Sequence, residues 1–244
     1  MTTGCARRAG GIAIRQRRAA GAALGAAAAA LVAAGGTGTS AGAMTIKKVE
    51  GGPAGVETIL LEGKIEEGDA LALQGYIAKL PVGAKIVVHL NSTGGVVREA
   101  IATGRIIHKN RIRTVVPSKA ACTSACVTIF VGGRDWETGG PWQLKYSTAR
   151  LGVHSFKREY ADRVYSGPDM SKAVADTLNA VLNYTEYWDE VGADYDLLYL
   201  KWATSNKEMH YIPNERLLEL GIQVLDERSG EIIDPRAVKE RLAR

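Results

Sequence analysis

The chain has 244 residues, with 31 basic and 26 acidic side chains and a formal net charge of +5. Five of the basic residues, all arginines, lie in residues 1–43, which contain no acid, so the rest of the chain balances 26 basic against 26 acidic residues. A balanced charge without a dense basic patch argues against nucleic acid or a strongly anionic substrate as the partner. The roughly two hundred residues after this segment are enough for one compact core.

Residues 1–43 have the layout of an export signal. The arginines are followed by an Ala- and Gly-rich stretch, residues 19–34, and by the small residues 41–43. This order is typical of a cleavable secretory signal, and its arginine pairs leave the choice between the general and the twin-arginine route open. An uncleaved membrane anchor is the alternative, but the stretch is shorter and less apolar than the ~20 residues of a spanning helix. We expect a periplasmic or secreted domain over residues 44–244, with membrane contact only if the segment is retained.

Three units follow in which a strand pattern precedes a helix or a turn. The predicted strands cover residues 56–62, 85–90 and 112–116, and the predicted helices cover residues 68–80 and 96–108. The third strand leads through a turn at Ser124 into the apolar segment 125–131. Successive strand–helix units predict an α/β fold with largely parallel strand pairing.

The later segments are less regular. Residues 134–149 contain a Gly-Gly-Pro sequence and are interpreted as a loop or insertion before a short apolar run that ends on His154. Residues 169–191 have the strongest helical periodicity in the chain. Shorter helices are predicted over residues 197–202 and 213–222. The long helix is a candidate surface for self-association into a homo-oligomer.

Two cysteines, Cys122 and Cys126, remain after removal of the export segment, which carries Cys5. An even pair in an oxidising compartment favours a disulfide, although a spacing of four on one helix is awkward for a bridge. Two small buried apolar side chains fit equally well. A cysteine nucleophile is a third interpretation. A metal site is the weakest, because only His154 could join the pair and a closed site takes four ligands, so we expect no metal and no cofactor.

Ser124 is the candidate nucleophile. Gly94 and Gly95, which follow the second predicted strand, could turn backbone N–H groups toward a substrate oxygen. His154, at the end of another apolar run, could accept the proton of the serine hydroxyl. Each feature also has a structural interpretation: a serine N-cap, an ordinary glycine turn and a hydrogen-bonded histidine at a strand end.

In their order and spacing these features resemble the proteolytic subunit of the Clp protease and its crotonase-like relatives, in particular an exported branch. The landmarks are Asn91-Ser92-Thr93-Gly94-Gly95, the turn at residues 120–125, Gly152-Val153-His154 and the pattern Met209…Glu215…Leu220-Gly221-Ile222, which together cover residues 56–224. The resemblance implies an α/β fold built as a crotonase-like spiral of β-β-α units with a long C-terminal helix. It also implies a serine peptidase that acts on a peptide or protein substrate.

Carried over to this chain, the resemblance implies that Ser124 is the nucleophile and His154 the general base. The N–H groups of Gly95 and Ala125 would form the oxyanion hole. A serine hydroxyl is a poor nucleophile until an imidazole takes its proton, and the charge that develops on the carbonyl oxygen needs fixed donors.

The sequence departs from the family at the third catalytic residue. The family has an aspartate shortly before the terminal pattern, whereas residues 204–208 contain none and Asn206 is the best positional match. An asparagine can orient a neutral histidine but cannot stabilise an imidazolium by charge. Slow turnover is one expectation, and rescue by Glu208, Asp194 or Asp196 is another.

Two other classes of function stay open. A non-catalytic module that binds peptides or proteins is favoured by the missing aspartate. An acyl-CoA enzyme on the same scaffold is disfavoured, because an exported protein meets little CoA and the serine–histidine pair would go unused.

Overall fold

The computed structural model describes residues 43–235, except residue 53 and residues 157–160. The predicted export segment, residues 1–43, lies outside the described residues apart from its last residue, and so does Cys5. Within the described part of the chain, no helix combines the length and the hydropathy needed to cross a bilayer.

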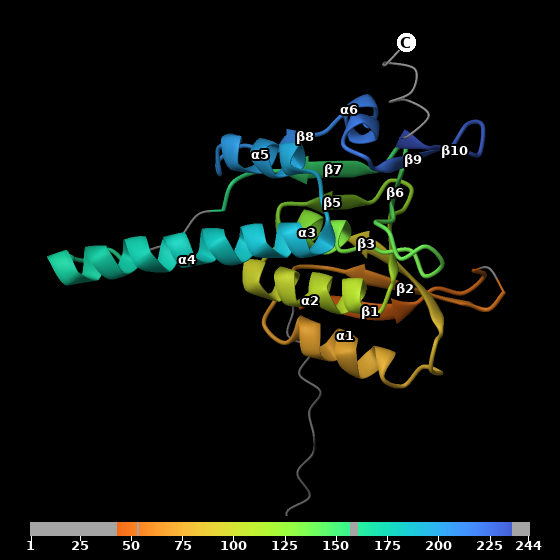
Figure 1. Cartoon of the computed structure of the whole chain (residues 1–244), viewed down its shortest axis with the longest axis horizontal. Helices are drawn as coiled ribbons and strands as arrows, with labels where there is room; N and C mark the ends of the chain where they lie inside the picture. The colour runs from red at the N-terminus through yellow and green to blue at the C-terminus, as the bar shows by residue number, and fades with distance from the viewer. Residues whose placement is uncertain (1–42, 53, 157–160, 236–244) are drawn as a thin grey trace, which may run out of the picture. The chain divides into compact units, whose positions relative to one another are not determined.

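The larger sheet has seven strands in the order β1-β2-β3-β4-β6-β9-β10 (Figure 1). These are β1 (Thr45–Lys48), β2 (Val56–Glu62), β3 (Lys85–Asn91), β4 (Arg113–Val116), β6 (Gln143–Tyr146), β9 (Gln223–Asp226) and β10 (Glu231–Ile233). The strands from β2 to β9 pair in parallel, and the antiparallel strands β1 and β10 form the two edges. The predicted α/β fold with largely parallel pairing is confirmed.

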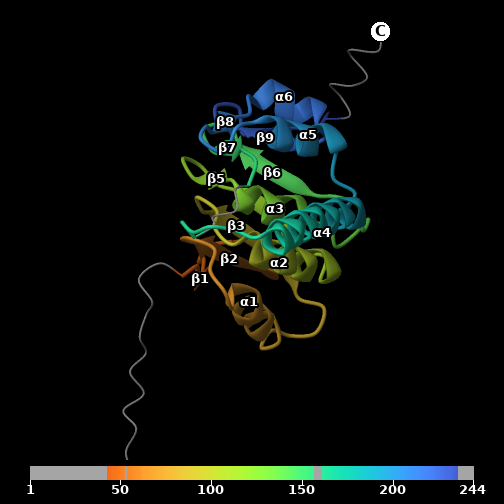
Figure 2. The same cartoon turned by 90° about the vertical axis from the view of Figure 1, so that its left-hand side faces the viewer.

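Six helices are described. They are α1 (Asp69–Ile77), α2 (Val97–Lys109), α3 (Ala125–Val131), α4 (Gly167–Val191), α5 (Tyr195–Ala203) and α6 (Asn214–Glu219). Helix α2 packs between α1 and α3 and also contacts α4, and Figure 2 shows these helices stacked along the sheet. The long helix predicted over residues 169–191 begins two residues earlier, because Ser166 and Asp169 form a capping box there.

A second sheet of three strands carries the turn at Ser124. It consists of β5 (Ala121–Thr123), β7 (Arg150–Val153) and β8 (His210–Tyr211). Strands β5 and β7 are parallel, with Thr123 opposite Gly152, and β8 pairs antiparallel with β7. Because parallel neighbours end at the same edge of a sheet, the residues that follow β5 and β7 come together there.

The interpretation of residues 134–149 as a loop is wrong, because they contain β6, an interior strand of the larger sheet. Two of its buried side chains are polar and find partners in the core. The Gln143 amide donates to the Val131 and Gly133 carbonyls at 3.0 and 2.8 Å, and the Lys145 ammonium donates to Asn214 Oδ1 at 2.6 Å. A strand pattern read from apolar residues does not register such a segment.

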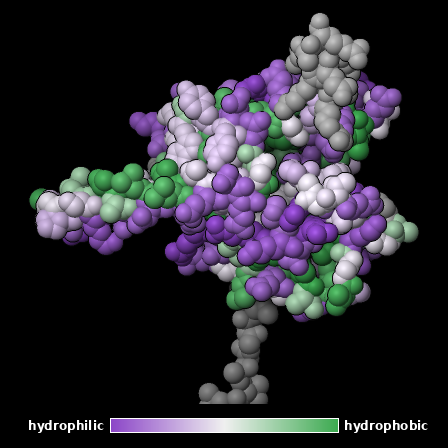
Figure 3. Space-filling model, viewed as in Figure 1, coloured by the Kyte–Doolittle hydropathy of each residue, from purple (hydrophilic) through white to green (hydrophobic). Residues whose placement is uncertain are grey.

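Helix α4 has a buried and an exposed half. Its C-terminal half buries Tyr184, Tyr187 and Trp188, whereas its N-terminal half runs beyond the ends of α2 and α3 (Figure 1). The α4 apolar face consists of Met170, Val174, Leu178 and Leu182, which are 54–59% exposed. Residues four apart lie on one side of a helix, and this side forms a continuous apolar strip in Figure 3.

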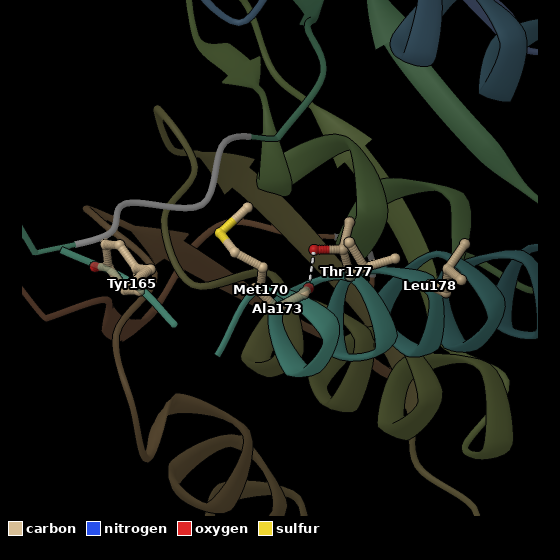
Figure 4. Close-up of a pocket in the computed structure, with 6 residues that line it drawn as sticks. Tyr165, Met170, Ala173, Thr177 and Leu178 are labelled. Atoms are coloured by element: carbon tan, nitrogen blue, oxygen red, sulfur yellow. Dashed lines mark hydrogen bonds between the residues drawn. The ribbon is translucent and has the colours of Figure 1, made fainter. Parts of the chain in front are cut away.

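A shallow cavity of about 340 Å³ lies on this half of α4 (Figure 4). Tyr165, Met170, Ala173, Val174, Thr177 and Leu178 line it. Thr177 is the one polar residue that α4 contributes to this lining. Its hydroxyl donates to the Ala173 carbonyl of the preceding turn at 2.8 Å. The cavity is therefore apolar, and self-association through α4 stays a prediction.

Candidate active site

Ser124 occupies the turn between β5 and α3 with φ 59° and ψ −120°. A non-glycine residue in such a conformation costs about 1–3 kcal/mol and persists only where its surroundings enforce it. The Ser124 N–H donates to the Gly152 carbonyl of β7 at 2.9 Å, which holds the turn against the second sheet. The hydroxyl makes no capping hydrogen bond to α3, so the N-cap interpretation does not account for this serine.

The glycine turn lies directly against this serine. Ser92 connects the larger sheet to β5, because its N–H donates to the Ala121 carbonyl and its carbonyl accepts from the Thr123 N–H, at 2.8 and 3.0 Å. A Cβ atom on Gly94, which has φ 96°, would lie only 2.8 Å from Ser124 Cβ. Only a glycine allows the turn to approach the nucleophile candidate this closely.

Gly95 turns its N–H away from the neighbouring segment. On that side Gly94 O accepts from Ile65 N, and Val96 N donates to Ile65 O, each at 2.9 Å. In an extended chain successive residues point their backbone groups to opposite sides. Gly95 N–H therefore points to the opposite side from Ile65, and the residue is exposed.

The two predicted oxyanion donors are not equally accessible. Ala125 begins α3, where a backbone N–H has no partner within the helix, and in the described part of the chain it donates to no backbone carbonyl. Ala125 is nevertheless fully buried, and a Cβ on Gly94 would lie 2.8 Å from its nitrogen. A substrate oxygen could reach the Ala125 N–H only after the atoms that cover it move aside.

His154 follows β7 and is partly buried. Its Nδ1 atom is buried without a hydrogen-bond partner among the described residues, and no hydrogen bond joins its ring to the Ser124 hydroxyl. Catalytic hydrogen bonds are often long in unliganded enzymes. Burial and the positive charge of Lys201 lower the pKa of His154, which leaves the imidazole neutral and able to accept a proton at pH 7.

Lys201 is the residue that the sequence analysis missed. It lies in the last turn of α5, is 2% exposed, and donates from Nζ to the backbone carbonyls of Ser124 and His154 at 3.4 and 3.3 Å. Burial lowers its pKa to about 8. One signal could have found it: Leu197, Leu198 and Lys201 share the spacing of one helix face, and all three are buried.

In the described part of the chain, no hydrogen bond joins the predicted third residue, Asn206, to Nδ1 of His154. Asn206 is exposed in the turn after α5. Asp194 accepts from the Asp196 N–H at the start of α5, and Asp196 binds Arg216. Glu208 is exposed. Among the described residues, the charged group that acts on His154 is the ammonium of Lys201.

A disulfide joins Cys122 and Cys126, with their Cα atoms 5.2 Å apart. The two residues do not share one helix, because Cys122 lies in β5 and Cys126 in α3, and this arrangement removes the geometric objection to a bridge. Both side chains are fully buried. The bridge closes the turn that contains Ser124, and among the described residues no group of His, Cys, Asp and Glu is arranged to hold a metal ion.

Replacing Cys122 and Cys126 together by alanine is expected to lower the free energy of unfolding by about 2 kcal/mol, as loop-closure entropy gives for so short a loop. Urea unfolding under non-reducing conditions measures this change. Val82→Ala, which truncates a fully exposed side chain, serves as the control and should leave the midpoint in place. An unchanged midpoint in the double variant would mean that the bridge does not hold the turn.

A cavity of about 470 Å³ opens beside Gly95, between the N-terminal end of α2 and α4. It is lined by Gly95, Val96, Val97, Arg98, Phe156, Thr177 and Ala180. The lining is mostly apolar, and the guanidinium of Arg98 is paired with Glu67. Phe156 is fixed by an edge-to-face contact with Trp202, with ring centroids 5.4 Å apart. An extended ligand that reaches Ser124 could place an apolar side chain in this cavity.

No protein-family model matches the sequence, and no curated protein matches it either. The residues and their geometry are therefore what indicates the chemistry of this site.

Proposed function

We propose that this protein is an exported serine hydrolase, similar in type to the Clp proteolytic subunit, that cleaves peptide bonds in the periplasm or outside the cell. The observation that carries the proposal is the strained backbone of Ser124 at a strand–helix turn, in contact with the Gly94-Gly95 turn. A strained serine beside a glycine turn is expected where a hydroxyl must be presented to a substrate. The parallel core and the second sheet support the crotonase-like architecture.

In this mechanism the neutral imidazole of His154 takes the proton of the Ser124 hydroxyl, and Oγ attacks the carbonyl carbon of the substrate. Negative charge on the carbonyl oxygen is accepted by the Gly95 N–H and, once the atoms that cover it have moved aside, by the Ala125 N–H. His154 then gives its proton to the leaving amine. Water, activated by the same imidazole, releases the acyl group and restores Ser124.

A fluorophosphonate probe tests this proposal, because it phosphonylates only serines with an activated hydroxyl. The wild-type protein should be labelled, and Ser124→Ala should not. Ser118→Ala, which removes an exposed serine from the segment before β5, is the matched control and should be labelled like the wild type. Equal labelling of wild type and Ser124→Ala would remove the basis of the proposal.

A peptide-binding module without catalysis is the second candidate. The covered Ala125 N–H favours it, and so does the Nδ1 of His154, which has no hydrogen-bond partner among the described residues, since both are incomplete parts of a hydrolase site. This candidate predicts no labelling of the wild type, together with peptide binding that Ser124→Ala preserves. Ala180→Trp, which would fill the cavity beside Gly95, should weaken that binding.

A further inference from the structure

We propose that Lys201 is the positioning residue of this site: its amino group holds the backbone carbonyls of Ser124 and His154 together and places a positive charge beside the imidazole. The proposal rests on the proposed function, because it assigns a role within the same site. Lys201 would act through the histidine and the turn, without touching the substrate.

The geometry ties two otherwise separate elements. Ser124 lies between β5 and α3, and His154 follows β7, yet one atom, Lys201 Nζ, donates to a carbonyl of each, at 3.4 and 3.3 Å. The carbonyl of Ser124 belongs to the strained residue itself. A donor fixed on α5 therefore restrains both the orientation of the turn and its separation from the histidine.

Core packing alone does not explain a lysine here. Lys201 is 2% exposed, and among the described residues its amino group bonds to backbone carbonyls and to no carboxylate. A buried cation without a counter-ion is costly, and an apolar side chain of similar length would avoid that cost. The ring of Tyr184, 5.6 Å from Nζ, offers only a weak cation–π contact.

The charge acts on His154 across the pH range in which the imidazole titrates. Among the described residues, the titratable groups in contact with Lys201 are His154, after β7, and the phenol of Tyr184 on α4, whose pKa is raised by burial. From the β5–α3 turn, Lys201 contacts the uncharged Ser124. Lys201, with a pKa of about 8, is a cation wherever His154 titrates. Burial lowers the pKa of His154, and the repulsion between two like charges lowers it further, so the base form of His154 persists to lower pH.

The test compares Lys201→Met, which removes donor and charge, with Lys201→Gln, which keeps N–H donors without a charge. The rate of fluorophosphonate labelling is measured as a function of pH and probe concentration. Lys145→Met is the matched control, because Lys145 is also 2% exposed and bonded to backbone carbonyls, but away from Ser124 and His154. The ring of His154 is titrated separately by NMR.

We expect Lys201→Met to label about 10²-fold more slowly at saturating probe, as misplacement of a reacting group by about 1 Å does. The probe concentration that gives half the maximal labelling rate should be nearly unchanged, because Lys201 does not line the cavity beside Gly95. Lys201→Gln should be less impaired. In both variants the acid limb of the pH profile and the His154 titration should move to higher pH, and in Lys145→Met neither should move.

An unchanged His154 titration in both Lys201 variants would overturn the proposal, as would a loss of labelling with no shift of the acid limb, which would indicate a purely structural role. If Lys201→Met does not fold, Lys201→Gln still provides both measurements. A wild type that is not labelled at any pH refutes the proposed function instead, and the NMR titration still decides whether Lys201 controls the charge of His154.

Discussion

Gly95→Ala is expected to slow fluorophosphonate labelling of Ser124 by at least 10²–10³, about the effect of losing one oxyanion donor. A Cβ atom at this position would lie 2.1 Å from Ile65 O and 2.8 Å from Ile65 N. Both are backbone atoms held in hydrogen bonds, so they cannot move aside cheaply. The φ of Gly95, +150°, also disfavours a side chain. The turn must shift, and the N–H of Gly95 shifts with it.

Gly83→Ala is the matched control for this variant. Gly83 also has a positive φ, +79°, but a Cβ atom there would meet nothing within 4 Å. Gly83→Ala should cost only the strain of the left-handed conformation, about 1–2 kcal/mol of stability, and should leave labelling unchanged. Labelling rates at several probe concentrations separate the two variants. Labelling of Gly95→Ala at the wild-type rate would show that this N–H takes no part in the reaction.

Gly104→Ala is expected to lower the free energy of unfolding by about 2–4 kcal/mol, from overpacking and a lost buried hydrogen bond. Gly104 lies in α2, where a Cβ atom would be 2.0 Å from the Tyr187 hydroxyl oxygen. Tyr187 is fully buried, and its hydroxyl donates to the Thr128 carbonyl of α3 at 2.7 Å. The glycine therefore lets α2, α3 and α4 meet around one phenol.

Urea unfolding measures this loss of stability, and two further variants test its cause. Gly75→Ala replaces another helical glycine, in α1, where a Cβ atom would meet nothing within 4 Å. It should stabilise the protein by about 0.5–1 kcal/mol, the opposite sign to Gly104→Ala. Tyr187→Phe should recover part of the stability lost in Gly104→Ala, because it removes the oxygen that clashes. Additive effects of the two changes would contradict this account.

The regular elements could be predicted where apolar periodicity or an apolar run identifies them. Strands β2 and β3 and helices α2 and α4 lie within two residues of their predicted bounds. Strand β5 is not predicted, because it has only three residues, too few to show an alternating pattern. Strand β6 is not predicted, because two of its buried side chains, Gln143 and Lys145, are polar and bind polar partners. Tertiary hydrogen bonds of this kind leave no trace in a local pattern.

The part of the site that could be predicted is the one that depends on which strands pair with each other. The backbone segments of Ser124, Gly94 and His154 come together because β5 pairs with β7 and Ser92 bridges to β5. The group beside the histidine is not predicted, because the spacing of Leu197, Leu198 and Lys201 indicates one inward face of α5 but not which elements that face meets. Asn206 and Lys201 are only five positions apart, yet one is exposed and the other is buried at the site.

The rate at which the disulfide beside Ser124 is reduced can measure how often this part of the structure opens. Neither sulfur atom is accessible to solvent, so a small thiol can attack only when the first turn of α3 detaches from β5. The rate at which dithiothreitol reduces the bridge in the native protein would then report how often that detachment occurs. A ligand that binds in the cavity beside Gly95 and holds this turn in place should slow the reduction. The reduction rate would then measure how much of the site is occupied by ligand, even if the ligand is not cleaved.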